Sequence, residues 1–387
     1  MIYLDNAATG FPKSDAVLRA MQEAFVSCGN PGRSSHAPAR NSDRILFRCR
    51  QLLAERFGST PENVILTKNA TEALNIAIKG LYRPGGEVLT STLEHNAVMR
   101  PLHALRAAQG ITLKQFRVDL TEDAVTVENF RIAAGERADM AVVTHASNVC
   151  GRVLPIPEMR KAVRREDFLL IVDGSQTAGH LPIDIRTLGA DVLCLPGHKG
   201  LYGPMGTGAL ICNPDRVPYF RTLIEGGSGI DSRASGMPEV LPERLEAGTP
   251  NVYGIAGLAA ALAEFRFPER EHLLYRQLLR ELRQFPGIRL YGQPADPSCV
   301  SIASVASVAS DARYMPVLLF NREGTDCETL GELLAEKDIA VRAGLHCAPA
   351  AHRALGTLES GGVRVSLGRA TTEADLYAFL EAMRSIR

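Results

Sequence analysis

Lys199 is the side chain of this sequence that most directly suggests covalent chemistry. It follows the apolar run DVLCL (191–195) by four residues and lies in a glycine-rich stretch, PGHKGLYGPMGTG (196–208). Glycines let a planar group approach the backbone closely, and a lysine amine held there can form a Schiff base with a carbonyl compound. Taken alone, such a residue is more often a solvated loop lysine, so the interpretation depends on its neighbours.

Asp173 ends FLLIVD (168–173), the most apolar strand-like run in the chain. A carboxylate there is costly without a partner, although a helix cap or a salt bridge would supply one. Pyridoxal phosphate is a more specific partner, because its ring nitrogen must stay protonated and a carboxylate beside that nitrogen keeps it so. Gln176, three residues further on, could then hydrogen-bond the phenolic oxygen of the same ring.

A phosphate group needs a helix N-terminus, and VILTKNATEALNIAIKG (64–80) supplies one. Asn69 and Glu72 have capping-box spacing ahead of an apolar helical run. The free N–H groups and the helix dipole would favour a phosphate, and the Thr71 hydroxyl would add a contact. A plain capped helix with no ligand is the alternative.

Two further polar residues follow predicted strands. His95 in VLTSTLEHNAV (88–98) could stack on a planar cofactor and move protons, or be a partly exposed turn histidine. Asn148 in THASNVCG (144–151) could donate to a cofactor or substrate oxygen, or form an Asx turn. The joint occurrence of these residues with Lys199 and Asp173 is more specific than any one of them.

Cys347 lies in RAGLHCAPA (342–350), a stretch too rich in small residues to be core. A structural cysteine needs no such setting, whereas a reactive thiolate must be accessible. Gly344 and His346 fit a mobile loop with a proton acceptor beside the thiol. The sequence therefore offers Cys347 as a candidate nucleophile.

The elements that must position these residues alternate between strand and helix patterns. The predicted strands are 63–67, 87–91, 139–145, 168–173, 191–195 and 208–212, with helix-like segments such as 70–80 and 157–166 between them. This alternation predicts an α/β fold with a mostly parallel sheet covered by helices. Ligands gather at the carboxyl ends of such strands, which is where the candidate residues lie.

The remainder of the chain differs in composition and in predicted secondary structure. Residues 225–251 form a long Gly, Ser, Met and Pro-rich loop, typical of a functional or interface segment, and a helix-like run, 252–265, follows it. The last third mixes amphipathic helices (272–285, 373–386) with short strands (315–320, 363–367) and reads as a smaller α+β C-terminal domain. We therefore predict a large cofactor-binding domain at 14–250 and a small domain formed by 1–13 plus 251–387.

Composition excludes several other classes of protein. The 387 residues include 43 Lys and Arg against 43 Asp and Glu, which argues against a nucleic-acid or membrane-surface protein. No signal peptide or apolar run of about 20 residues is visible. No metal site or disulfide framework is expected, since the cysteines are scattered without a CxxC pair, and reduced cytoplasmic thiols fit better. They are Cys28, Cys49, Cys150, Cys194, Cys212, Cys299, Cys327 and Cys347.

The ordered motifs of the chain resemble those of the class V aminotransferases, fold type I of the pyridoxal-phosphate enzymes. Within that family the chain is similar to the SufS-like, group II cysteine desulfurases and selenocysteine lyases. The resemblance spans nearly the whole chain: YLDNAATGFP (3–12), NATEALN (69–75), EHNAV (94–98), SNVCG (147–151), VDGSQTAGH (172–180), GHKGLYGPMGTG (197–208), EAGTPN (246–251), RAGLHCAP (342–349) and VRVSLG (363–368).

The resemblance implies a role for each matching position. The implied catalytic residues are Cys347, Lys199 and His95. The implied residues for pyridoxal 5'-phosphate are Lys199, Ala70, Thr71, His95, Asn148, Asp173, Gln176, His198 and Thr249. Thr249 is expected to reach its ligand from the other subunit of a homodimer. The implied substrate-binding residues are Asn148, Arg364, Arg342 and His36, with a bidentate arginine suited to a carboxylate.

The activity implied is conversion of L-cysteine to L-alanine, with the sulfur left on Cys347 as a persulfide that an acceptor protein could receive. The route served stays open between iron–sulfur cluster assembly, tRNA thiolation and a narrower use. A selenocysteine lyase, or another pyridoxal-phosphate lyase or aminotransferase, is the alternative. A sulfur-carrier scaffold without catalysis is disfavoured by Lys199 and Asp173. Three positions depart from the family pattern: Pro196 replaces a phosphate-binding hydroxyl and has no N–H, Ala370 precedes Thr371 where Asn is common, and Leu345 makes the cysteine loop less polar.

Overall fold

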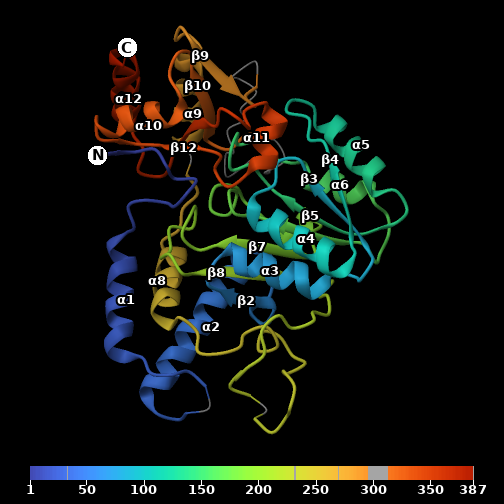
Figure 1. The fold of residues 1–387 in the computed structure, drawn as a ribbon. Coiled ribbons are helices and arrows are strands. Elements are labelled where there is room, and N and C mark those ends of the chain that lie inside the picture. The colour runs from blue at the N-terminus through green and yellow to red at the C-terminus, as the bar shows by residue number, and fades with distance from the viewer. Residues whose placement is uncertain (33, 231, 269, 295–312, 387) are drawn as a thin grey trace.

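A seven-stranded sheet forms the centre of the molecule (Figure 1). The structure is a computed structural model that describes residues 1–387 except 33, 231, 269, 295–312 and 387. The strand order is β2-β8-β7-β6-β5-β3-β4. The bounds are β2 Val64–Thr67, β3 Glu87–Ser91, β4 Thr112–Phe116, β5 Ala138–Thr144, β6 Leu169–Asp173, β7 Val192–Pro196 and β8 Gly208–Cys212. The β4–β3–β5–β6–β7 pairs are parallel, and β8 runs antiparallel to β7 and β2.

Helices cover both faces of this sheet, as the continuous apolar strands require. Along β6, Ile171 packs in one hydrophobic cluster with α3 and α4, whereas Leu170 and Val172 pack in another with α2, α5, α6 and α8. The helices of these layers are α2 Ala37–Phe57, α3 Ala70–Leu81, α4 Asn96–Gln109, α5 Asp123–Ala134, α6 Ile156–Ala162 and α8 Val252–Ala263, and α7 Ile185–Leu188 and the 3-10 turn η1 Pro61–Asn63 are short connectors. The mostly parallel α/β sheet is therefore confirmed.

A second core lies between the C-terminal elements and the N-terminal segment. Its antiparallel four-stranded sheet has the order β12-β13-β10-β9, and a two-stranded pair joins β1 to β11. The elements of this core are β1 Ile2–Tyr3, α9 Arg270–Leu282, β9 Ile288–Tyr291, β10 Val317–Arg322, α10 Cys327–Ala335, β11 Ile339–Ala340, β12 Arg342–Gly344, β13 Gly362–Ser366 and α12 Glu373–Ser385. The helix α11, Pro349–Leu355, lies in the same third of the chain, but its Ala351 and Leu355 pack with the first core. Leu4 packs into this core beside Leu274 and Phe379, so the first residues pack with the last third of the chain.

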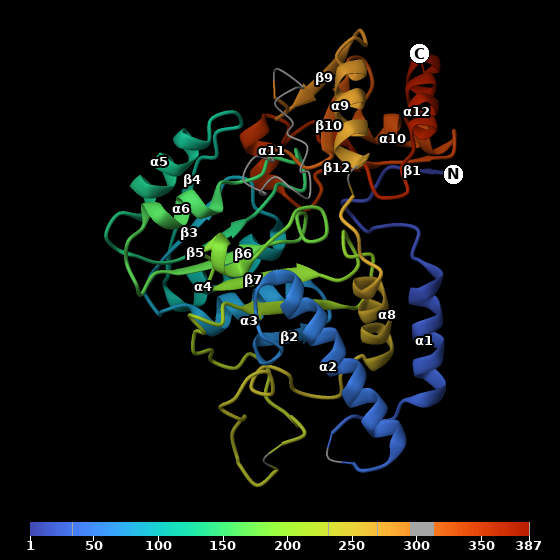
Figure 2. The ribbon, with the colours of Figure 1, turned by 180° about the vertical axis from the view of Figure 1, so that it is seen from behind.

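Helix α8 begins at residue 252 but packs with the first core. Asn251 caps it by accepting the Gly254 N–H at 3.0 Å, and the helix lies beside α2 and α1 (Asp15–Ser27) in both views (Figures 1 and 2). Ile255 and Leu258 belong to the large hydrophobic cluster. The domain division at residue 250 stays a prediction, and this packing is the observation that favours a later boundary.

The structure also extends a loop and adds strands, namely β4 in the central sheet and β1, β9, β11 and β12 in the second core. The strand β4 (TLKQF) was not predicted, because it is an edge strand with mostly polar, partly exposed side chains. The described residues between β8 and α8 form neither helix nor strand, so the irregular segment is longer than 225–251. Among the described residues, no helix has the length and apolar character needed to cross a membrane, and every described cysteine is free. Cys299 lies outside the described residues.

Candidate active site

Four adjacent parallel strands bring the predicted side chains to one edge of the sheet. Lys199 follows β7, Asp173 ends β6, Asn148 follows β5 and His95 follows β3, and these strands are consecutive in the order β7-β6-β5-β3. Because the strands are parallel, their carboxyl ends meet at the same edge. The predicted grouping of these residues follows from the sheet topology.

Lys199 and His95 are both held toward their neutral forms. Burial lowers the pKa of Lys199 from 10.5 to about 8, and the charge of Asp173 partly opposes that shift. Burial, followed by the charge of Lys199, lowers the pKa of His95 to about 4. His95 caps α4 by accepting the Ala97 N–H on Nδ1 at 2.9 Å, so its remaining proton is on Nε2. The site thus combines an amine of raised nucleophilicity with a neutral imidazole donor.

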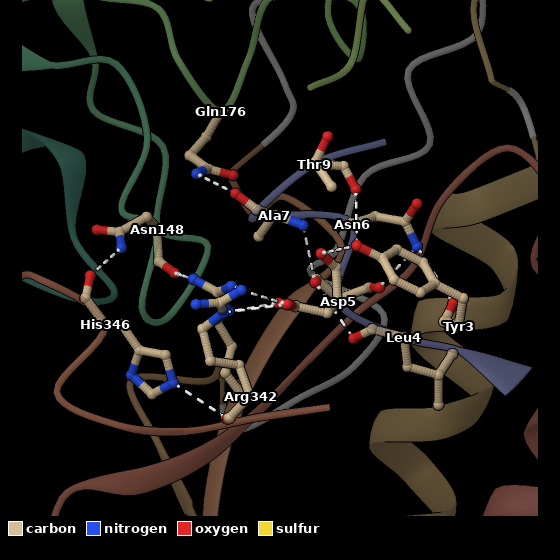
Figure 3. Close-up of polar contacts among 12 residues, drawn as sticks. Tyr3, Leu4, Asp5, Asn6, Ala7, Thr9, Asn148, Gln176, Arg342 and His346 are labelled. Carbon is tan, nitrogen blue, oxygen red and sulfur yellow. Dashed lines mark hydrogen bonds and ion pairs between the residues drawn. The ribbon is translucent and has the colours of Figure 1, made fainter. Parts of the chain in front are cut away.

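Asp173 and Gln176 are fixed by backbone groups. Asp173 is 3% exposed, and its Oδ1 accepts the Ser175 N–H at 2.9 Å. Gln176 Nε2 donates to the Ala7 carbonyl at 3.1 Å, as Figure 3 shows. The hydrogen bond to Ala7 ties the strand-end loop after β6 to the N-terminal segment.

Arg364 and Arg342 lie opposite each other on β13 and β12 and share one carboxylate. Arg364 NH2 donates to Asp5 Oδ1 at 2.7 Å, while Arg342 donates to Asp5 Oδ2 through Nε at 3.0 Å and NH2 at 2.8 Å (Figure 3). Arg364 NH1 donates to the Asn148 carbonyl at 3.0 Å. Arg364 is almost fully buried, and its Nε has no hydrogen-bond partner among the described residues.

The Cys347 loop is tethered to the same edge of the sheet. Asn96 N–H donates to the Cys347 carbonyl at 2.7 Å, and Asn148 Nδ2 donates to the His346 carbonyl at 2.9 Å (Figure 3). Both His346 and Cys347 have positive φ, 51° and 54°, which is uncommon for residues with a Cβ. The Cys347 residue remains exposed. A predicted mobile loop is therefore held in place by hydrogen bonds from beside His95 and from Asn148.

His346 belongs to a buried chain of hydrogen bonds. Its Nε2 lies 3.2 Å from the Arg342 carbonyl and therefore donates to it. Its Nδ1 then accepts from His352 Nε2 at 3.1 Å, and His352 Nδ1 accepts from the Thr357 hydroxyl at 2.8 Å. Burial lowers the pKa of His346 to about 3. With both ring nitrogens occupied, His346 orients the loop rather than serving as the free proton acceptor expected for Cys347.

The predicted phosphate-binding helix has Asn69 as its N-cap, but Glu72 bonds to the Lys68 N–H instead of closing a capping box on Asn69. Asn69 Oδ1 accepts the Glu72 N–H at 2.9 Å, and Glu72 Oε2 accepts the Lys68 N–H at 2.5 Å. Ala70 and Thr71 occupy the first turn, whose N–H groups have no intrahelical acceptor. Gly208 allows this turn to approach β8, since a Cβ there would lie 2.8 Å from backbone atoms of Asn69.

The remaining predicted residues are more scattered. His198 Nδ1 is 3.1 Å from the Thr9 hydroxyl, and burial and Lys199 lower its pKa to about 4. Thr249 is exposed and lines a cavity of about 940 Å³ with Thr67 and other residues at the β2–α3 junction. His36 is exposed and caps α2 by accepting the Ala39 N–H. Its described contacts do not bring it to Lys199 within one chain.

Asp5 and His352 were not predicted as site residues. Asp5 lies in YLDNAATG, a stretch with no periodic pattern, and it is brought to Arg364 by an isolated bridge between Asp5 and Ser366 of β13. His352 lies within the helix α11, where a buried histidine is usually read as a core residue. The one available signal for Asp5 was a carboxylate in an otherwise apolar N-terminal segment.

Comparisons with known proteins find relatives of this chain over nearly its whole length. Residues 2–379 match the family model for class-V aminotransferases. The chain is 31% identical over 399 residues to a "probable cysteine desulfurase" of Methanothermobacter thermautotrophicus, covering 100% of this chain and 94% of that protein. It is 32% identical over 398 residues to a "probable cysteine desulfurase" of Pseudomonas aeruginosa, covering 99% and 93%.

Solved structures give the same result. The apo cysteine desulfurase of Thermococcus onnurineus NA1 has a TM-score of 0.89 at 28% identity, covering 100% of this chain and 94% of that chain. The cysteine desulfurase CsdA of Escherichia coli has a TM-score of 0.83 at 27% identity, covering 99% and 94%. From its sequence, its fold and the residues at the edge of its sheet, this chain belongs to the class-V aminotransferase family.

Proposed function

We propose that this protein is a pyridoxal-phosphate-dependent cysteine desulfurase, which converts L-cysteine to L-alanine and leaves the sulfur on Cys347 as a persulfide. The observation that carries the proposal is the exposed Cys347, held at the edge of the sheet by hydrogen bonds from Asn96 and Asn148 to its loop. An accessible thiol, on a loop fixed to the sheet edge that also carries an amine of lowered pKa, suits sulfur transfer from a bound amino acid.

The residues present fit pyridoxal 5'-phosphate. Lys199 supplies the amine, Asp173 a buried carboxylate and Gln176 an amide for the ring. The capped first turn of α3, with Thr71, would hold the phosphate, and Gly208 lets that turn approach closely. When bound, the cofactor supplies an electron sink that weakens the bonds at the substrate's α-carbon.

The substrate carboxylate would bind to Arg364. This guanidinium is buried and has an Nε–H without a described acceptor, so an incoming carboxylate would satisfy it. A buried charge-assisted pair of this kind fixes orientation as well as affinity. The Arg364 guanidinium also acts electrostatically on Lys199, which places the two charges in the same site.

Lys199 and Cys347 then carry out different steps: Lys199 takes up a proton, and Cys347 takes up the sulfur atom. Lys199, with a pKa of about 8, can take the substrate's α-proton near neutral pH. The Cys347 thiolate attacks the substrate sulfur, so that an S–S bond forms and the C–S bond breaks. The electron pair of the broken bond remains on the carbon skeleton, which takes up protons and leaves as alanine. No external oxidant or reductant is needed for this half of the cycle.

The test is product analysis with L-cysteine and a thiol reductant. We expect alanine and sulfide in equal amounts from the wild type and loss of both in Cys347→Ser. Cys28→Ser is a matched control, since Cys28 is free and partly exposed but lies at the C-terminal end of α1. Turnover of selenocysteine by Cys347→Ser, with none of L-cysteine by the wild type, would instead identify a selenocysteine lyase.

Two further parts of the proposal concern the oligomeric state of the protein and the delivery of the sulfur. We propose a homodimer, because Thr249 and His36 are exposed and the described contacts of His36 do not bring it to Lys199 within one chain, so a second copy would complete the site. Sedimentation analysis tests the dimer, and activity in mixtures of Thr249→Ala and Lys199→Ala variants tests a shared site. Delivery of the sulfur to an acceptor protein for iron–sulfur cluster assembly in the cytoplasm stays a prediction.

A further inference from the structure

The carbonyl of His198, the residue before Lys199, accepts three hydrogen bonds from the segment that connects β1 to α1. The donors are the Thr9 hydroxyl at 3.0 Å, the Gly10 N–H at 3.0 Å and the Lys13 ammonium at 2.7 Å. A carbonyl oxygen has two lone pairs, so the two neutral donors alone would satisfy it. The bond from Lys13 is therefore more than hydrogen-bond satisfaction requires.

Lys13 is a costly residue at this position. Its side chain is half-buried, and burial lowers its pKa from 10.5 to about 8. Among the described residues, its ammonium contacts the His198 carbonyl and the face of the Tyr202 ring, whose centroid lies 5.7 Å from Nζ, but no carboxylate. A cation held away from water without a counter-charge lowers the stability of the folded state. A perturbed group of this kind beside a reactive amine points to a role in function.

Both peptide groups that meet at the Lys199 Cα are held in place. The peptide before it is fixed through the His198 carbonyl. The Lys199 carbonyl accepts the Tyr202 N–H at 2.9 Å, and it lies so close to Gly10 that a Cβ added there would be 2.6 Å away. Because peptide groups are planar, fixing both of them sets the direction in which the Lys199 side chain leaves the backbone.

The bond from Lys13 is the shortest of the three and the only one from a charged donor, and charge-assisted hydrogen bonds are the stronger kind. We propose that Lys13 is a positioning residue, whose ammonium holds the His198–Lys199 peptide so that the Lys199 amine points to the edge of the sheet that carries Asp173. The proposal rests on the proposed function only in taking Lys199 as the amine that bonds to the cofactor aldehyde.

The test uses the cofactor-free full-length protein and two ligands. Absorbance follows the rate at which the protein bonds to pyridoxal 5'-phosphate, and calorimetry measures its affinity for pyridoxine 5'-phosphate, which has no aldehyde. In Lys13→Met we expect bond formation to slow by about tenfold or more, while the affinity for pyridoxine 5'-phosphate stays within about twofold of the wild type. Lys13→Arg keeps a cationic donor and should restore the rate to within about threefold. Lys161→Met, at an exposed lysine of α6, is the matched control.

The pH dependence of the rate separates positioning from a simple effect of charge. Bond formation needs the neutral amine, so the rate should rise with pH through the pKa of Lys199, which burial lowers to about 8. His198 stays neutral in this range, because burial, followed by the charges of Lys199 and Lys13, lowers its pKa to about 4. Lost orientation lowers the plateau of the rate in Lys13→Met and leaves its midpoint unchanged. A shifted midpoint with an unchanged plateau would overturn the proposal.

Urea unfolding separates positioning from a merely structural role. Lys13→Met removes an uncompensated charge and leaves the His198 carbonyl with two donors, so the variant should be at least as stable as the wild type. A less stable variant that loses affinity for both ligands together would overturn the proposal. If Lys13→Met does not fold, Gly10→Ala decides, because its Cβ would displace the Lys199 carbonyl and should slow bond formation about tenfold. An unchanged rate in that variant would refute the argument.

These outcomes are distinct from the test of the proposed function. No alanine and no sulfide from L-cysteine in the wild type would overturn the proposed function and leave the comparison of bonding rates intact. Equal bonding rates in the wild type and Lys13→Met would overturn the proposal for Lys13 alone, whatever the turnover of L-cysteine.

Discussion

Replacing Lys199 by methionine should stabilise the cofactor-free protein. Burial lowers the pKa of this amine from 10.5 to about 8, so the folded state binds the proton less well than the unfolded chain. At about 1.4 kcal/mol per pKa unit, the protonated lysine costs about 3 kcal/mol in the folded state. Methionine keeps the apolar stem without the charge, so Lys199→Met should gain most of that free energy at pH 7.

The pH dependence of the free energy of unfolding shows whether the charge of Lys199 causes the difference in stability. Between pH 8 and 10.5 the unfolded chain holds more protons than the folded protein, so the wild-type free energy of unfolding should rise with pH through this window. The advantage of Lys199→Met should therefore be full below pH 8 and vanish near pH 10.5. Urea unfolding of both cofactor-free proteins at several pH values measures it. A variant that is no more stable at pH 7, or a difference that does not vary with pH, would refute the reasoning.

Three further substitutions test other parts of the site. Burial raises the pKa of Glu94 to about 8, so the free energy of unfolding of the wild type should fall as the pH rises from 4.5 to 8. In Glu94→Gln this fall should be smaller by about 3–5 kcal/mol, as measured by urea unfolding at several pH values. His352→Phe removes the hydrogen-bond donor to the His346 ring and should lower the free energy of unfolding by about 2–4 kcal/mol. A variant as stable as the wild type would contradict the hydrogen bonds from Thr357 through His352 to His346. Gly208→Ala would press a Cβ against the Asn69 backbone at the start of α3. It should weaken cofactor binding about tenfold, as measured by fluorescence titration. An unchanged affinity would exclude the first turn of α3 as the phosphate site.

The sequence was sufficient where one strand carries one chemically distinctive residue at its end. Asp173 ends a continuous apolar run, and Lys199 follows another, so both positions follow from the rule that parallel strands meet at their carboxyl ends. The edge strand β4 was missed because its exposed polar residues lack the apolar signal on which strand prediction depends.

The contacts of Asp5 and His352 could not be derived in the same way. Asp5 reaches Arg364 across 359 residues of chain, and the contact depends on an isolated parallel bridge between Asp5 and Ser366, which has no sequence signature. His352 gains its role from the turn that directs His346 back onto α11. Such contacts depend on tertiary register, which periodicity does not encode.

In the proposed mechanism, the geometry of the Cys347 loop would couple sulfur transfer to substrate binding. Two consecutive positive φ angles at residues with a Cβ are costly, on the order of 1–3 kcal/mol each, and persist because hydrogen bonds hold the loop. One of these bonds comes from Asn148, whose carbonyl also accepts from Arg364. A carboxylate that moves Arg364 would therefore act on Asn148, and through it on the carbonyl next to Cys347. Asn148 both accepts from Arg364 and holds the Cys347 loop, so in that mechanism the thiol and the substrate carboxylate would share one support.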